Sequence, residues 1–303
     1  MERPSSTRSA ILVMAVLVVI WGYAWVAAKI ALAYSGPFDF AALRVAVGVV
    51  GLGCLTAVSG RSLRPAHLGL AVLIGVVQTA AFLILNTWAL VDGGPGKTSI
   101  LTFTMPFWVL LFAWPFLGER IEGVQWGAVA LAAAGLVSIL EPWRSQTTLL
   151  SKCLAVGAGM AWAAGVILAK RHQRRHRVDV LGFTFWQMLI GLVPMGLVAW
   201  AVPQRAIEWS WPFVASLGFS GIVATGAGWF LWLYVLQRLP AGTTSLASLG
   251  IPVIAAASSA LQLGERLRPA ELAGMALIGV ALGIISWDMS RRQRPPDPAM
   301  GQE

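Results

Sequence analysis

The sequence predicts an all-α polytopic membrane protein with ten transmembrane helices, arranged as two inverted five-helix repeats. Three observations predict this fold class: an apolar composition, a series of apolar runs of membrane-spanning length, and a charged tetrapeptide that occurs twice. Of the 303 residues, 57% are hydrophobic and 12% are charged, about half the charged fraction of an ordinary soluble domain. A soluble protein of this composition would expose large apolar patches, so we expect the chain to lie in a bilayer.

Ten apolar runs, each bounded by charge, Pro or Gly, predict ten spans. A helix needs about 20 apolar residues to cross about 30 Å of hydrocarbon. The first run is too long for the apolar region of a signal peptide and lacks a small-residue cleavage site, so we interpret it as a retained span. The predicted spans are 10–33, 40–58, 67–90, 97–117, 124–140, 152–170, 180–201, 213–237, 243–263 and 270–289.

The loop charges predict the orientation. Ten spans place both termini on one side, and Lys and Arg are more numerous there, above all around 170–177 and 291–294. Positive loops lie in the cytoplasm, so we expect a bacterial inner (plasma) membrane protein with both termini on the cytoplasmic side.

The net charge of +9 is spread over these short clusters, a pattern that argues against nucleic acid as a partner. The two Cys and three His show no metal-ligand spacing, so neither a metal nor a cofactor is expected.

The tetrapeptide Leu-Gly-Glu-Arg occurs at 117–120 and again at 263–266. Upstream of both copies the order is the same: Gly-x-Thr-Ser, then a mid-span proline, Pro106 or Pro252. The predicted domains are therefore a first five-span repeat at 1–145, a second at 146–290, and a cytoplasmic tail at 291–303. Because five is odd, the second repeat must be inverted. Inverted repeats are typical of alternating-access transporters. We interpret the two prolines as kinks or hinges, and Gly118 and Gly264 as helix ends.

These features resemble the drug/metabolite transporter superfamily and, within it, the EamA-domain family. The resemblance covers about residues 10–290. It is carried by the two Thr-Ser…Pro…Leu-Gly-Glu-Arg blocks, by Trp21-Gly22-Tyr23-Ala24-Trp25 with Lys29, and by Pro37 with Ala41-Ala42-Leu43-Arg44. Within the family, the chain looks most similar to exporters of amino acids, including the aromatic amino-acid exporters of the YddG type. The resemblance implies a transporter rather than an enzyme, with a small-molecule substrate, and we expect a monomer or weak homodimer.

Polar and aromatic residues deep in the spans predict the substrate cavity. A polar side chain that faces lipid is costly, so these residues should face the bundle interior. The alternative is that the rings fill space and that the amides and hydroxyls, including Thr104 and Thr225, join helices. A cavity of this kind suits a neutral or zwitterionic solute with an apolar side chain. The candidates are Trp21, Gln78, Asn86, Thr102, Trp162, Trp186, Gln187, Trp229 and Ser248.

Two cations within spans, Lys29 and Arg44, are possible contacts for a substrate carboxylate. The alternative is that they extend to the lipid headgroups. No carboxylate falls at mid-span, which disfavours both a pump coupled through a buried Glu and a metal-dependent membrane enzyme. We therefore expect export of amino acids or related metabolites by alternating access and facilitated diffusion. Efflux of toxic drug-like compounds and, less favoured, processing of a lipid are the alternatives.

Overall fold

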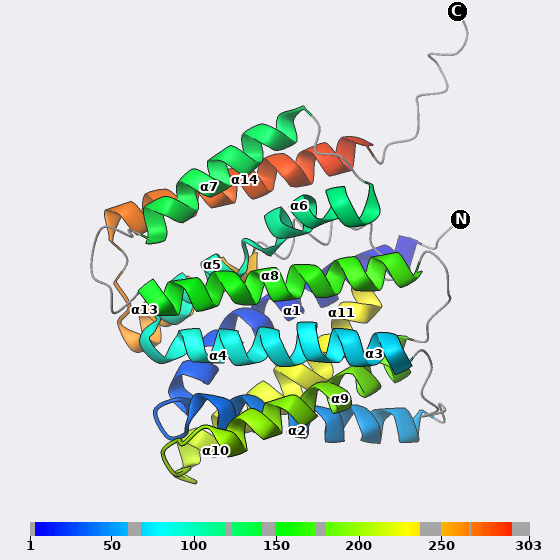
Figure 1. Cartoon of the computed structure of the whole chain (residues 1–303), viewed down its shortest axis with the longest axis vertical. Coiled ribbons are helices and arrows are strands. Elements are labelled where there is room, and N and C mark those ends of the chain that lie inside the picture. Colours follow the sequence, from blue (N-terminus) through cyan, green and yellow to red (C-terminus); the bar gives the residue numbers. More distant parts are fainter. Residues whose placement is uncertain are drawn as a thin grey trace, which may run out of the picture.

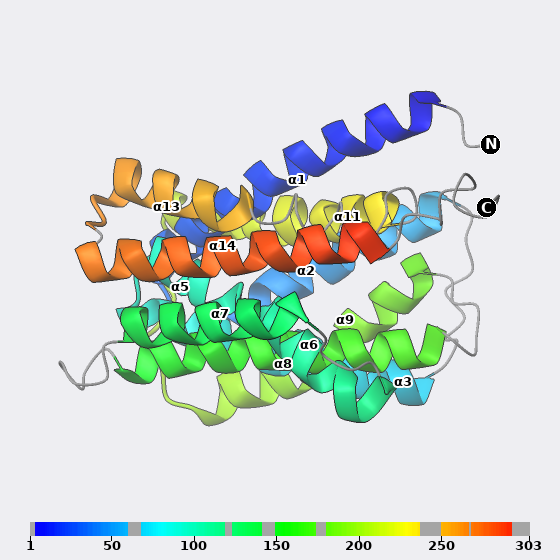
Figure 2. The same cartoon turned by 90° about the horizontal axis from the view of Figure 1, so that it is seen from above.

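A computed structural model describes residues 4–59, 68–118, 123–140, 149–173, 180–236, 250–266 and 268–292. Within these ranges the chain is helical and contains no strand. The helices lie side by side in one bundle, and the start of α1 (Pro4–Ala31) and the end of α14 (Pro269–Arg292) lie at the same end along the helix direction (Figures 1 and 2).

Most helical segments follow the predicted apolar runs. Among the described residues, seven helical stretches are long and apolar enough to cross a membrane, and one of them, Pro95–Phe116, is interrupted at Phe103 and Thr104. Three shorter apolar helices, Val124–Gly135, Gly250–Leu263 and Leu272–Ala281, fall within the fifth, ninth and tenth predicted spans. The remaining elements are α2 (Pro37–Val58), α3 (Leu68–Ile74), η1 (Gly75–Ala81), α4 (Phe82–Asp92), α5 (Pro95–Thr102), α6 (Met105–Leu117), α7 (Val124–Leu140), α8 (Leu149–Gln173), α9 (Val180–Ala201), α10 (Trp211–Gly218), η3 (Phe219–Ala227), α11 (Gly228–Leu236) and α13 (Gly250–Leu263).

Two of these helices contain a wide, π-helical stretch. The stretch η1 joins α3 to α4, and η3 joins α10 to α11. At the end of η1 the amide of Phe82 donates to Val77 O, five residues back, and at the end of η3 the amide of Gly228 donates to Val223 O. Such i→i+5 turns are rare and often occur at functional sites. The last residues of η1 and η3, Ala81 and Ala227, have the same sequence separation as the two Leu-Gly-Glu-Arg copies.

Of the two prolines that were predicted as mid-span kinks, Pro106 lies in the first turn of a helix. Helix α5 ends at Thr102, and α6 begins at Met105 with Pro106 in its first turn. Pro252 is buried in α13, and residues 237–249, which precede this helix, lie outside the described residues. A proline is tolerated in the first turn because the amide it lacks has no intrahelical partner there. The fourth predicted span is therefore broken at Phe103 and Thr104 rather than bent at Pro106.

The predicted glycine helix ends are confirmed. Gly118 follows α6 in the left-handed conformation with φ 70°, and Gly264 follows α13 with φ 65°. Glycine adopts this conformation without a steric penalty from a Cβ. The glycine of the tetrapeptide therefore ends the helix in both copies. In the first copy, Glu119 and Arg120 lie outside the described residues.

Helix packing pairs segments from the two halves of the chain. Helix α1 packs along α13, α2 along α9, and α8 along α5 and α6. Helices α7 and α14 lie side by side (Figures 1 and 2). They are antiparallel, because Gln125 at the start of α7 donates to Asp288 near the end of α14 at 2.7 Å, while Ser138 donates to Ala270 O at 3.1 Å.

Candidate functional site

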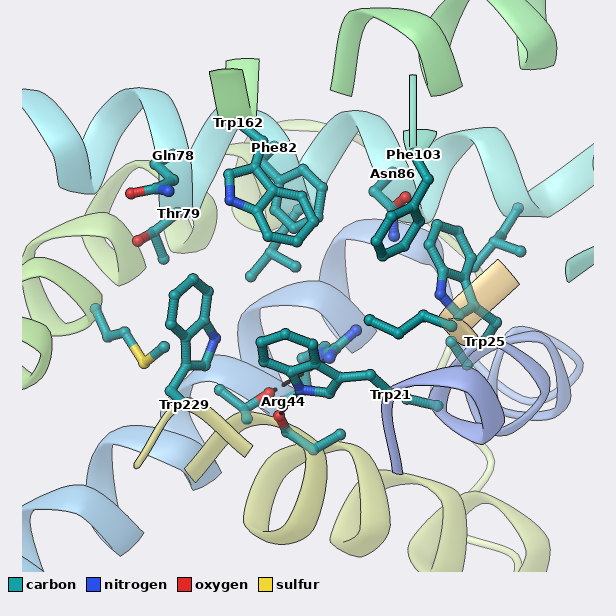
Figure 3. A pocket seen from close by; sticks show the side chains of 18 residues that line it. Trp21, Trp25, Arg44, Gln78, Thr79, Phe82, Asn86, Phe103, Trp162 and Trp229 are labelled. Carbon is teal, nitrogen blue, oxygen red and sulfur yellow. Dashed lines mark hydrogen bonds between the residues drawn. The ribbon is translucent and has the colours of Figure 1, made fainter. Parts of the chain in front are cut away.

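A cavity of about 740 Å³, part of it open to the surroundings, lies in the middle of the bundle. Its described lining comes from both halves of the chain: α1, α2, η1 and α4 from the first, and α8, α9, η3, α11 and α13 from the second. Figure 3 shows Trp21, Trp229 and Arg44 on one side of the space and Trp162, Phe82 and Phe103 on the other.

Aromatic rings form most of the wall. The ring of Trp162 packs against both Phe82 and Phe103, with centroid distances of 5.0 Å and 5.8 Å. On the opposite side Trp21 contacts the edge of Trp229 at 5.8 Å. The Trp21 indole N–H donates to Ala224 O at 2.8 Å, so this ring has its polar atom satisfied and its position fixed. Rings arranged in this way suit a flat apolar group.

Arg44 is the only ionisable side chain among the described residues that line the cavity. Its Nη2 donates to Thr225 Oγ1 at 3.4 Å, a long hydrogen bond, and the Thr225 hydroxyl donates to Ser220 O at 2.7 Å. The Nε of Arg44 is buried and has no hydrogen-bond partner. A buried guanidinium that lacks an anion is costly, so the cavity has an unused capacity to bind negative charge.

The two π-helical stretches supply polar groups to the cavity. Gln78 and Thr79 come from η1, and Ala224 and Thr225 come from η3. The Gln187 amide donates to Thr79 Oγ1 at 3.2 Å. Because a π turn is wider than an α turn, it changes which side chains of the helix face the cavity. Thr79 was not singled out from the sequence, although it and Thr225 have the separation of the two tetrapeptide copies.

The structure brings together most of the predicted cavity residues. Trp21, Gln78, Asn86, Trp162 and Trp229 line the cavity, as does Arg44.

Three other candidates lie outside the lining. Thr102 lies behind the wall, where its hydroxyl donates to Asn86 Oδ1 at 3.2 Å. Gln187 is likewise buried behind Thr79. Trp186 packs against Phe185 away from the lining. Ser248 lies outside the described residues.

Lys29 does not line the cavity either. Its Nζ donates to Leu90 O at 2.6 Å and to Val91 O at 2.7 Å, and thereby caps the end of α4. These carbonyls belong to the last turn of a helix, where they have no intrahelical partner. Sequence reasoning did not identify this role, because the end of a distant helix is not visible in the residues around Lys29.

Two further side chains cap helices at the same end of the bundle, which is opposite the start of α1. The Glu265 carboxylate accepts from Gly96 N at 3.0 Å and Lys97 N at 3.4 Å, at the start of α5, and also from the Ser259 hydroxyl. The Gln204 Oε1 accepts from Phe38 N at 2.8 Å in α2. Both caps join a loop of the second half to a helix of the first, so they hold the two halves together at this end.

Comparison with known proteins supplies relatives along almost the whole chain. The chain is 28% identical to the "Probable amino-acid metabolite efflux pump" of Escherichia coli over 92% of this chain and 95% of the relative. It is 26% identical to the "Probable terminal-alkyne amino-acid exporter" of Streptantibioticus cattleyicolor over 91% of each. It is also 26% identical to the "Uncharacterized transporter YoaV" of Bacillus subtilis, over 91% of this chain and 96% of the relative.

A solved structure and a family match complete the comparison. One crystal structure, 17% identical, superposes with a TM-score of 0.67 and covers 94% of this chain and 99% of its own, which shows a shared fold. The EamA-like transporter family matches residues 8–140 and, a second time, residues 149–287. With apolar helices of membrane-spanning length and family matches along both halves, the chain belongs to the EamA-like transporter family, within the drug/metabolite transporter superfamily.

Proposed function

We propose that this EamA-family transporter exports amino acids or related small metabolites from a bacterial cytoplasm across the inner membrane. The observation that carries the proposal is the central cavity, with its aromatic walls, its amides and its single guanidinium. An apolar side chain fits between the rings of Trp162 and Trp21, and the carboxylate of the solute fits Arg44. The names of two relatives, an amino-acid metabolite efflux pump and an amino-acid exporter, support this substrate class.

The proposed mechanism is alternating access between two inverted repeats of five spans, at 1–145 and 146–290. Several observations support it. The family matches the chain twice, and the α1–α13 pairing has a counterpart in the pairing of α8 with α5 and α6. The start of α1 and the end of α14 lie at one end of the bundle (Figure 1), as an even number of crossings requires. We place that end, and both termini, in the cytoplasm.

The side-chain caps indicate which end of the cavity is closed. Lys29, Glu265 and Gln204 tie helix ends together at the end opposite the start of α1, which on this topology faces outward. A discontinuous helix at the site, here α5 and α6, is common in transporters that work in this way. Outward release then requires these caps to separate. Transport runs down the gradient of the solute, because no carboxylate lies among the described lining residues to carry a proton.

Flux through the purified protein tests the proposal. Proteoliposomes should release labelled Phe, Met or Thr down a gradient faster than protein-free liposomes do. The absence of flux for these amino acids and for a broad panel of other small metabolites would contradict the proposal. Flux of cationic dyes alone would instead favour the efflux of toxic compounds.

A further inference from the structure

The charge balance of the cavity is one-sided. Arg44 supplies one positive charge, and no Asp or Glu lies among the described lining residues. The segment 237–249, between α11 and α13, contains no acidic residue in its sequence either. A zwitterion requires acceptors for its ammonium group, charged or neutral, as well as donors for its carboxylate. Among the described lining residues the only charged partner is Arg44, which suits the carboxylate.

The guanidinium of Arg44 is available for an anion. Its Nε is buried without a partner, and its Nη2 makes one long hydrogen bond, of 3.4 Å, to Thr225. Arg binds carboxylates through two parallel N–H···O bonds. A carboxylate at this position would satisfy the unpartnered N–H and compensate a buried charge, and both effects favour binding.

An ammonium group finds only neutral acceptors among the described lining residues, such as the amide oxygens of Gln78 and Asn86. The Asn86 Oδ1 already accepts one hydrogen bond from Thr102, and the Thr225 hydroxyl already donates to Ser220 O. Faces of Trp162 and Phe82 can attract a cation, but the positive charge of Arg44 lies in the same cavity and opposes it. The aromatic walls are therefore better matched to an uncharged apolar group.

We propose that the cavity selects monocarboxylates with an aromatic or similar apolar body, and that an α-ammonium group is not required. The ligands then include N-acyl amino acids and deaminated acids, such as 2-oxo and 2-hydroxy acids, beside the amino acids themselves. This inference rests on the proposed function and narrows its substrate class. It also gives export a driving force, because a potential of about 100 mV, negative inside, favours outward movement of a monoanion by about 50-fold.

Binding to the wild-type protein in detergent tests the selectivity directly. Four probes share one ring and differ in charge: 3-phenylpropanoate, N-acetyl-L-phenylalanine, L-phenylalanine and L-phenylalaninamide. Dose-dependent thermal shifts give a Kd for each. We expect the two monoanions to bind with a Kd no higher than that of L-phenylalanine, and the cationic amide to give no shift. A Kd for both monoanions above that of L-phenylalanine, or a shift with the amide, overturns the inference.

Substitution at Arg44 tests the anchor. We expect Arg44→Gln to raise the Kd of every carboxylate probe at least tenfold, and Arg44→Lys to raise it less. Arg205→Gln is the matched control, because Arg205 is exposed in the loop between α9 and α10 and does not line the cavity. An unchanged Kd in folded Arg44→Gln overturns the anchor. If that variant does not fold, the ranking of the four probes on the wild-type protein still decides.

Transport separates failure of this inference from failure of the proposed function. In proteoliposomes with a potassium diffusion potential set by valinomycin, efflux of 3-phenylpropanoate should increase when the interior is negative, whereas L-phenylalanine efflux should not change. Efflux of L-phenylalanine without efflux of either monoanion overturns the inference and leaves the exporter proposal intact. The absence of flux for all four probes and for the wider amino-acid panel overturns both.

Discussion

Lys29 and Arg44 are both cations within apolar helices, yet their surroundings give them different tasks. Lys29 carries a compact ammonium with three N–H donors, which suits the two adjacent carbonyls of Leu90 and Val91. Arg44 carries a planar guanidinium, and it lines the cavity with part of its hydrogen-bonding capacity unused. The sequence offered both as carboxylate contacts. Their different roles, Lys29 as a helix cap and Arg44 as a lining residue of the cavity, depend on where each lies relative to helices that are distant in the sequence.

Replacement of Lys29 by Met should destabilise the protein without changing ligand affinity. The variant leaves the Leu90 and Val91 carbonyls without their donor, at a cost of about 1–2 kcal/mol. The thermal midpoint should fall, while the Kd for L-phenylalanine stays the same. Arg205→Met, which removes an exposed cation at the same end of the bundle, is the control and should leave the midpoint unchanged. A higher Kd at an unchanged midpoint would place Lys29 in the binding site.

At the scale of elements, helix ends are the points where the two halves meet. Glu265 lies beyond the end of α13, and its carboxylate accepts from the amides of Gly96 and Lys97 in the first turn of α5. A negative charge at a helix N-terminus is stabilised by the free amides and the helix dipole. The glycines before α5 allow the approach, because a Cβ at Gly94 would lie 2.0 Å from Glu265 Oε1.

Removal of this cap should weaken the contact between the halves. We expect Glu265→Ala to reduce the free energy of unfolding by about 1–2 kcal/mol, measured by denaturant titration in detergent. Arg266→Ala, at the neighbouring exposed residue, should have no effect and controls for the loop. Equal stability of the two variants would show that the carboxylate does not stabilise α5.

Glycine contacts between helices give a second test at this scale. A Cβ at Gly75 in η1 would lie 2.7 Å from Gln187 O of α9, a backbone atom. Gly75→Ala should therefore force η1 and α9 apart and destabilise the protein by about 1–3 kcal/mol. In α14, a Cβ at Gly279 would have no atom within 4 Å, so Gly279→Ala should be neutral or stabilising. Thermal midpoints that fall equally in both variants would contradict this difference.

The sequence indicates where the helices lie more clearly than how each one is wound. Apolar runs predict helices at most of the observed positions because burial in lipid demands length and low charge. Neither η1 nor η3 was predicted. An apolar run has the same composition whether its turns are α or π, so the composition does not reveal the wider turns. The break at Phe103 and Thr104 was placed at Pro106 for a similar reason: a proline in an apolar run marks a discontinuity but does not show which residue ends the preceding helix.

For the whole molecule, the proposed topology makes a labelling prediction. Ser59 follows α2 and is exposed, and Arg205 is exposed between α9 and α10. On this topology Ser59 faces the cytoplasm and Arg205 faces outward. In a background with Cys54→Ser and Cys153→Ser, a membrane-impermeant maleimide added to intact spheroplasts should label Arg205→Cys and not Ser59→Cys. Lysed membranes should label both and serve as the control, and the opposite pattern in spheroplasts would invert the orientation.

The site was less predictable than the fold because it depends on which helix faces meet. Of the deep Trp and amide residues named from the sequence, Trp21, Gln78, Asn86, Trp162 and Trp229 line one cavity. Phe82, Phe103 and Trp25 also line it, but apolar rings in an apolar run carry no signal of their own. Trp186 and Gln187 are neighbours in α9, yet neither reaches the lining, since the rotation of that helix is set by its packing.

The two wide turns also show how the halves share the cavity. The stretches η1 and η3 end at positions with the separation of the two tetrapeptide copies, and each places one threonine in the lining, Thr79 from the first half and Thr225 from the second. Because the described lining comes from both halves, neither half alone would enclose a solute.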